Sequence, residues 1–230
     1  MSPSLPSNVH KSNHPCLQTK LSQLRSATAN ARETKALVHE ITLILGCEAL
    51  ATGLTTLAGP TDITHLGYEY TTATTAPAKI SLVPILRSGL GMLDAMQTLL
   101  PNPVPVHHLG LFREPTTLQP VEYYNNLPYH KPTSAENSSG ASDLAILVDP
   151  VIATGGTCVA AIQTLKEWGV GRIIVVAVLG AHAGVENAAS EWPEGTEIWL
   201  AGVDEAVNER GMIRPGLGDV GDRLFLTLGK

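Results

Sequence analysis

The amino-acid sequence predicts an α/β fold in which a mainly parallel sheet is flanked by helices. Four short apolar runs have the length and composition of buried strands, at 80–86, 144–148, 172–180 and 197–203. Segments of helical periodicity separate them, and this alternation is typical of parallel sheets. The chain has 230 residues, 43% of them hydrophobic, which is enough for one domain with its own core.

The N-terminal quarter of the chain is predicted to contain a tail, a helix and loops. Residues 1–22 are rich in Ser, Pro and Asn, so we expect a flexible tail before a domain that spans 23–230. Apolar residues at helix spacing predict a helix over 28–51. Residues 55–78 are rich in Thr and Ala and contain Gly and Pro, which favours loops with one short strand.

The middle of the chain is predicted to contain a hairpin and an insertion. The strand at 80–86 leads into a helix. Residues 104–112 and 117–128 suit two antiparallel strands, so we expect a flexible β-arm over about 104–130. The low-complexity run 131–143 is expected to be an exposed insertion.

The last third repeats the alternation of strand and helix. Helices are predicted at 159–168 and 184–191, each between two of the buried strands. The glycine-rich segment 212–225 is expected to remain a loop that forms a small C-terminal hood.

Charge and cysteine content exclude several functional classes. The formal net charge of −6 disfavours a general affinity for nucleic acid or for an acidic membrane. Cys16, Cys47 and Cys158 are scattered, odd in number and without CxxC spacing, which indicates a reducing compartment. No apolar run approaches the length of a membrane span and the N-terminus has no apolar signal core, so we expect a cytoplasmic protein.

The run LAILVDPVIATGGT (144–157) predicts a phosphate-binding loop. A buried strand delivers Asp149 to its carboxyl end, where open parallel sheets bind ligands. The Thr-Gly-Gly-Thr turn at 154–157 then leads into a helix, whose first amides and positive dipole favour an anion. The Walker pattern GxxxxGK[ST] is absent. Asp149 is suited to accept hydrogen bonds from sugar hydroxyls beside the bound phosphate.

A second glycine-rich segment lies at 212–225. Its Gly216, Gly218 and Gly221 match G-x-G-x-x-G, the dinucleotide fingerprint. However, Pro215 precedes the match in place of a strand, and only nine residues follow Gly221, too few for a βαβ unit. A loop whose amides and carbonyls wrap a planar ligand fits this segment better.

These segments together resemble one known family. The run DPVIATGGT is similar to the phosphoribosyl pyrophosphate loop of type I phosphoribosyltransferases, and Asp-Pro in place of two acids is typical of uracil phosphoribosyltransferases. PILRSGLGM resembles that family's PILRAGLGM, with Ser88 in place of alanine. Residues 110–128 resemble its flexible arm, and MIRPGLGDVGDR resembles its uracil loop, usually YIVPGLGDAGDR. Met212, Val220 and Leu226 depart from the usual tyrosine, alanine and glycine.

The resemblance implies a function, which we state as expectations. The chain would transfer the phosphoribosyl group of 5-phospho-α-D-ribose 1-diphosphate to uracil and give UMP and diphosphate. Mg²⁺ would be carried by the donor without a direct protein ligand. Relatives form homodimers or homotetramers, and some respond to GTP, which makes GTP a candidate effector.

The resemblance also implies a set of site residues. Asp149 would hold the ribose, residues 153–157 the 5′-phosphate, and Arg87 the diphosphate; Asp219 would orient metal-bound water or help remove the N1 proton of the base. The expected catalytic residues are Asp149, Asp219 and Arg87. The expected donor-binding residues are Arg87, Arg113, Asp149, Pro150, Val151, Ile152, Ala153, Thr154, Gly155, Gly156, Thr157 and Asp219. The expected uracil-binding residues are Ile213, Gly218, Asp219 and Val220.

Two alternatives stay open at this point. A different base, such as hypoxanthine, adenine or orotate, is disfavoured because purine enzymes generally carry two acids at the position of 149–150. A catalytically weak or non-catalytic relative that senses nucleotides is compatible with the departures at Val220 and Leu226. The acidic balance speaks against RNA as its ligand.

Overall fold

The computed structural model describes residues 4–114, 120–128 and 141–227. Its main sheet has the strand order β1-β10-β9-β7-β4-β5-β6, and β8 pairs with β9 beside this path. All pairings in this sheet are parallel except that of β5 with β6. The strands are β1 Val9–Lys11, β4 Ile80–Leu86, β5 Leu109–Arg113, β6 Pro120–Asn125, β7 Leu144–Val148, β8 Val151–Ile152, β9 Arg172–Ala181 and β10 Thr196–Asp204.

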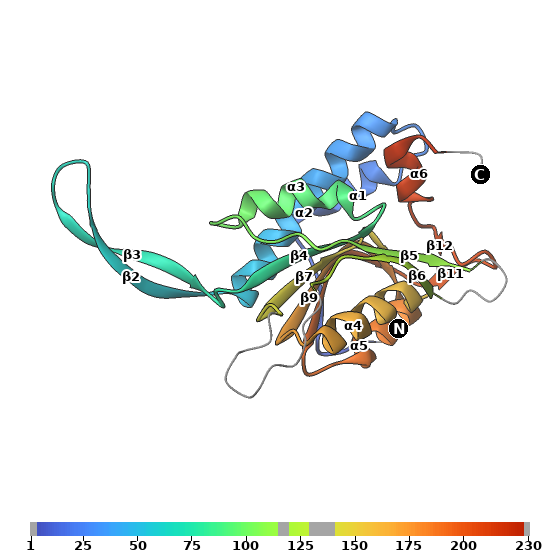
Figure 1. The fold of residues 1–230 in the computed structure, drawn as a ribbon. Coiled ribbons are helices and arrows are strands. Elements are labelled where there is room, and N and C mark those ends of the chain that lie inside the picture. The colour runs from blue at the N-terminus through green and yellow to red at the C-terminus, as the bar shows by residue number, and fades with distance from the viewer. Residues whose placement is uncertain (1–3, 115–119, 129–140, 228–230) are drawn as a thin grey trace.

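Helices cover both faces of this sheet, so the predicted α/β class is confirmed (Figure 1). One face packs against α1, α2 and α3, and the other against α4 and α5, which gives two separate apolar cores. The central strands are buried on both faces, as their uninterrupted apolar composition requires. The helices are α1 Pro15–Leu24, α2 Ala31–Gly53, α3 Leu90–Leu99, α4 Gly156–Trp168, α5 His182–Glu191 and α6 Val220–Phe225.

The described N-terminal residues differ from the predicted flexible tail over 1–22. β1 pairs in parallel with β10, and α1 buries Leu17, Leu21 and Leu24 beneath α2. These leucines lie at helical spacing within a segment of polar composition, and Pro15 occupies the first turn of the helix, where proline is tolerated. A short amphipathic helix therefore lies in a segment whose overall composition is polar.

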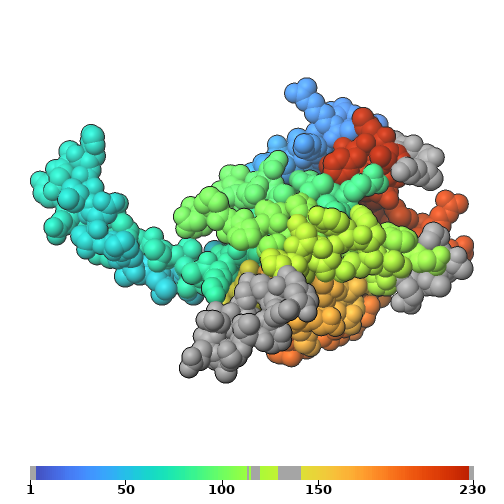
Figure 2. All heavy atoms as spheres, in the orientation of Figure 1, coloured from blue at the N-terminus to red at the C-terminus, as the bar shows by residue number. Residues whose placement is uncertain are grey.

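Residues 55–78 also differ from prediction, because they form a long hairpin instead of loops with one short strand. β2 (Thr55–Ile63) pairs with β3 (Glu69–Ala76) in a separate two-stranded sheet that projects from the body of the protein (Figures 1 and 2). Threonine-rich segments have high strand propensity, and the register shift between Ala58 and Thr61 accommodates the Gly-Pro pair inside β2.

The β-arm contains less regular strand structure than predicted. The strand expected over 104–112 begins at Leu109, and Val106 makes only an isolated bridge with Leu82. β5 and β6 form the predicted antiparallel hairpin. Most of the insertion predicted over 131–143 lies outside the described residues.

Helix α2 is long and apolar enough to cross a membrane, contrary to the prediction from the sequence. Its buried face, which includes Val38, Ile41 and Leu45, packs against α1, α3 and β9. Charged residues such as Lys35 lie on its exposed side. Its N-terminus carries a capping box, in which the side chains of Asn30 and Glu33 each accept a hydrogen bond from the other's backbone N–H. Helix α2 is therefore built as the core helix of this face.

Candidate active site

Asp149 lies directly after β7, at the carboxyl edge of the sheet. Its backbone N–H donates to Val176 O at 3.3 Å, and the Pro150 carbonyl accepts from the N–H groups of Val178 and Leu179 at 3.0 and 2.9 Å. Through these bonds the parallel pairing of β9 with β7 continues into pairing of β9 with β8. This pairing fixes the backbone on both sides of Asp149, a residue that is 7% exposed.

The turn from β8 into α4 depends on two glycines that lie far apart in the sequence. Gly155 caps α4 with φ +86°, and a Cβ there would lie 2.4 Å from Gly184 O. A Cβ on Gly184 would in turn lie 2.0 Å from Ala153 O. The close approach of α5 to this turn therefore requires glycine at both positions. The first amides of α4 have no intrahelical acceptors and are suited to bind an anion.

The loop after β4 brings a serine onto Asp149. A Cβ on Gly89 would lie 2.4 Å from Val148 O, so this glycine lets the loop rest on the end of β7. Ser88 Oγ consequently donates to Asp149 Oδ1 at 3.1 Å. The neighbouring Arg87 guanidinium is half-exposed and lies 3.7 Å from Asp222 Oδ1.

Burial governs the ionisation of this site. Burial raises the pKa of Asp149 to about 7, although the hydrogen bonds from Ser88 and Val151 favour the charged form and oppose this change. Burial, followed by the nearby Asp149 carboxylate, raises the pKa of the Cys158 thiol far above its usual value. Cys158 is thus a protonated core thiol and not a nucleophile.

The C-terminal segment forms a short hairpin followed by a helix. β11 (Ala206–Val207) pairs with β12 (Ile213–Arg214), and Gly218 has φ +74°. We predicted that this glycine-rich loop starts no helix, and that prediction is wrong. α6 follows at once, because Asp219 Oδ1 accepts from Asp222 N at 2.9 Å and caps it.

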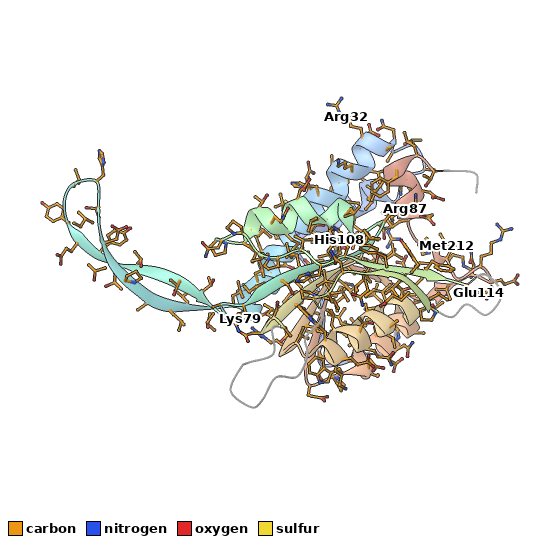
Figure 3. The ribbon with its side chains drawn as sticks, in the orientation of Figure 1. Arg32, Lys79, Arg87, His108, Glu114 and Met212 are labelled. Atoms are coloured by element: carbon orange, nitrogen blue, oxygen red, sulfur yellow. The ribbon has the colours of Figure 1, made fainter. Side chains whose placement is uncertain are left out.

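A cavity of about 1090 Å³ joins these segments. Figure 3 shows Arg87 and Met212, which both line it, on the same side of the molecule near α6. The predicted site residues that line the cavity are Arg87, Asp149, Val151, Ala153, Thr157, Gly218, Asp219 and Val220. The segments named in the sequence, from three distant parts of the chain, therefore meet at one place.

The other predicted site residues with described side chains lie beside this cavity without lining it. Pro150, Ile152 and Ile213 are buried, and residues 154–156 form the turn beside it. Arg113 ends β5, and its side chain lies outside the described part of the structure.

Several lining residues were missed by sequence reasoning. Glu209 and Arg210 belong to the turn between β11 and β12, and Tyr123 belongs to β6. The Asn-Glu-Arg-Gly turn just before the glycine-rich segment 212–225 was the only local signal for the first two. Ser88 was noted only as a departure from alanine. In the described ranges 4–114, 120–128 and 141–227, no group of three or more His, Cys, Asp or Glu side chains is placed to hold a metal.

Comparisons with known proteins identify the family of this chain. Residues 11–227 match the family model described as uracil phosphoribosyltransferase. A uracil phosphoribosyltransferase of Roseiflexus sp. (strain RS-1) is 41% identical over 218 residues, which cover 94% of this chain and 97% of that protein. One from Halalkalibacterium halodurans is 41% identical over 221 residues, covering 96% and 99%.

Solved structures share the fold of this chain. A protein of Aquifex aeolicus superposes with a TM-score of 0.83 at 28% identity, covering 95% of this chain and 98% of its own. The adenine phosphoribosyltransferase of Trypanosoma brucei shares the fold, with a TM-score of 0.52 at 16% identity and coverage of 93% and 89%. The family model and the full-length relatives agree that this chain belongs to the uracil phosphoribosyltransferase family.

Proposed function

We propose that this protein transfers the phosphoribosyl group of 5-phospho-α-D-ribose 1-diphosphate to uracil, giving UMP and diphosphate. The observation that carries the proposal is the meeting of three loops in one cavity at the carboxyl edge of the sheet. The phosphate loop would bind the 5′-phosphate of the donor, and the Arg87 loop would bind its diphosphate. The base loop (residues 212–225) would bind uracil.

The donor would lie between the phosphate loop and Arg87. The amides of the turn at 153–157 and the first turn of α4 would bind the 5′-phosphate, and the Asp149 carboxylate would accept from the ribose hydroxyls. Arg87 would leave Asp222 for the diphosphate, whose higher charge makes it the stronger partner. Arg113 is proposed as a second donor contact from the arm.

The charges that line the cavity suit a donor that carries Mg²⁺. Arg87 and Arg210 contribute two cationic groups, and Asp149, Glu209 and Asp219 contribute three carboxylates. A bare diphosphate would be repelled by these acids, whereas a diphosphate with its own Mg²⁺ would not. The metal would supply electrostatic stabilisation of the leaving group, and the protein would position the complex.

The base would lie against the base loop. Gly218 and Val220 line the cavity, and Ile213 is buried. Uracil alternates carbonyl acceptors with N–H donors, which backbone amides and carbonyls of such a loop can match. Val220 is 3% exposed and its branched side chain would narrow the slot around the ring.

The chemistry requires no nucleophilic side chain. The bond from ribose C1 to the diphosphate oxygen breaks as the bond from uracil N1 to C1 forms, and the N1 proton leaves the base. Catalysis would come from positioning and from stabilisation of the departing negative charge by Arg87. Asp219 lies on the cavity wall, where it would orient water or help remove the N1 proton.

The test is a turnover assay with purified protein, donor and Mg²⁺ against uracil, cytosine, hypoxanthine, adenine and orotate. The expected result is UMP formation from uracil alone, lost when Mg²⁺ is chelated. Formation of a purine nucleotide would reject the base assignment. Donor and UMP binding without turnover would favour the nucleotide-sensing relative. Adding GTP to the same assay tests it as an effector.

We also propose a cytoplasmic homo-oligomer, assembled through the β2–β3 hairpin. Leu66 and Tyr68 at its tip are 82% and 71% exposed, and Leu57 and Ile63 are more than half exposed. A projecting two-stranded hairpin is marginally stable alone and gains stability when such side chains pack on a second copy. Sedimentation analysis should show dimers or tetramers, and Leu66→Asp with Tyr68→Asp should shift them towards monomers. An unshifted distribution would reject the hairpin as the contact.

A further inference from the structure

A partly buried ion pair joins the N-terminal helix to the end of β10. Arg25 follows α1, and Asp204 is the last residue of β10. The guanidinium binds the carboxylate through two bonds, Nη2 to Oδ1 at 2.7 Å and Nη1 to Oδ2 at 2.8 Å. The Asp204 side chain is only 8% exposed, and neither residue lines the cavity. The proposed chemistry makes no use of this pair.

The pair also binds both backbone polar groups of Gly216. Asp204 Oδ2 accepts from Gly216 N at 2.9 Å, and Arg25 Nη1 donates to Gly216 O at 2.9 Å. Gly216 has φ +68°, and a Cβ there would lie 2.1 Å from Ile213 O. This turn of the base loop is therefore held in one conformation from outside the loop.

Arg223 of α6 fixes the next residue of the loop to the same helix. Its Nη1 donates to Leu217 O at 2.7 Å and to Leu24 O at 2.8 Å, and its Nη2 donates to Ser26 O at 3.2 Å. A cation beside the last carbonyls of α1 is also favoured by the helix dipole. Residues 216–217 are consequently bonded on two sides to the end of α1.

The charged state of Asp204 is stabilised in this arrangement. Burial by itself would raise the pKa of Asp204, but the hydrogen bonds from Arg25 and from Gly216 N–H, with the charge of Arg25, hold that pKa below its usual value. The ionised pair thus persists throughout the neutral range.

We propose that Arg25 and Asp204 are positioning residues that set the base loop for uracil, an inference that rests on the proposed transferase function. Residues 216–217 directly precede Gly218, Asp219 and Val220, which line the cavity. The donor side of the cavity is built on β4, β7 and α4, whereas among the described residues the side-chain hydrogen bonds of Arg25 and Asp204 run to each other and to Gly216. Disturbing the pair should therefore affect the base more than the donor.

The test compares Asp204→Asn and Arg25→Lys with wild type in steady-state UMP formation. In Asp204→Asn, the NH2 group of the asparagine would face another donor, either Gly216 N–H or Arg25. In Arg25→Lys, the lysine lacks the planar guanidinium that reaches both Asp204 and Gly216 O. We expect the KM for uracil to rise about tenfold or more in each variant, because charge-assisted bonds that order the loop are lost. The KM for the donor should stay within about twofold.

The matched control is Lys20→Ala, which removes the ion pair of α1 with Glu40 on α2 without touching the base loop. It should lower thermal stability by a similar or smaller amount and leave both KM values unchanged. If the two KM values of Asp204→Asn and Arg25→Lys instead change together, or neither changes, the pair is only a structural contact and the inference is overturned.

Amide hydrogen exchange supplies a readout that does not depend on turnover. Exchange at Gly216 and Leu217 should become faster in Asp204→Asn and Arg25→Lys, whereas exchange at the phosphate loop should not change. Unchanged exchange at residues 216–217 would overturn the inference even in an active enzyme. A wild type that forms no UMP would reject the proposed function, and the exchange result would still decide whether the pair orders the loop.

Discussion

Asp149→Asn should stabilise the free protein in mildly alkaline solution while it removes donor binding. In the folded chain burial raises the pKa of Asp149 from 3.8 to about 7. The carboxyl group therefore contributes most to stability when it is protonated, below its unfolded pKa. That contribution is lost as the pH rises through about 7, because burial disfavours the ionised carboxylate.

The size of the effect follows from the two pKa values. At about 1.4 kcal/mol per pKa unit, the full difference between 3.8 and about 7 corresponds to about 4 kcal/mol. Between about pH 5 and about pH 8.5, roughly 3 kcal/mol of this should be lost by the wild type and not by Asp149→Asn. The pH-dependent difference is the quantity to compare, since an amide that lacks some hydrogen bonds adds a pH-independent cost of about 1–3 kcal/mol.

The assay is urea unfolding of ligand-free wild type and Asp149→Asn at fixed protein concentration across this pH range. Asp143→Asn is the matched control, because Asp143 precedes the same strand but is exposed. Its stability should follow the wild type. Parallel pH dependence of the wild type and Asp149→Asn would refute the reasoning, because Asp149 would then titrate as it does in the unfolded chain. Calorimetry with the donor should show binding only to the wild type and the control.

Three further predictions concern the loops of the cavity. Arg87→Ala should lower turnover about 100-fold or more with unchanged thermal stability, since a charge-assisted contact to the leaving group is lost, and near-normal UMP formation would reject that contact. Ser88→Ala should raise the pKa of Asp149 by about one further unit, because a hydrogen bond to the charged carboxylate is lost. The pH at which donor affinity is half-maximal should rise by the same amount. If this pH does not change, the Ser88 bond is not formed in solution. Gly155→Ala should destabilise the fold by about 1–3 kcal/mol and weaken binding of ribose 5-phosphate, because an alanine there combines positive φ with a clash at Gly184 O. Wild-type stability together with wild-type ribose 5-phosphate affinity would contradict the close packing described for this turn.

The sequence by itself determined the class of fold and the location of the site along the chain. β4 and β7 begin and end where their apolar runs do, because strands buried on both faces leave a continuous local signal. The phosphate loop and the base loop were equally visible, since each needs glycine at particular backbone positions. Hydrophobic pattern and turn chemistry are properties of neighbouring residues, and they can be read without the fold.

Only the tertiary structure decided which residues support these loops. The bond between Ser88 and Asp149 spans 61 residues, and that between Arg25 and Asp204 spans 179. Gly155 and Gly184 require each other only because two helices approach closely. The order of the N-terminal segment likewise depends on β10, a strand late in the chain with which β1 pairs. Such contacts leave no periodic trace, because a polar residue that pairs across the fold looks in sequence like one that faces water.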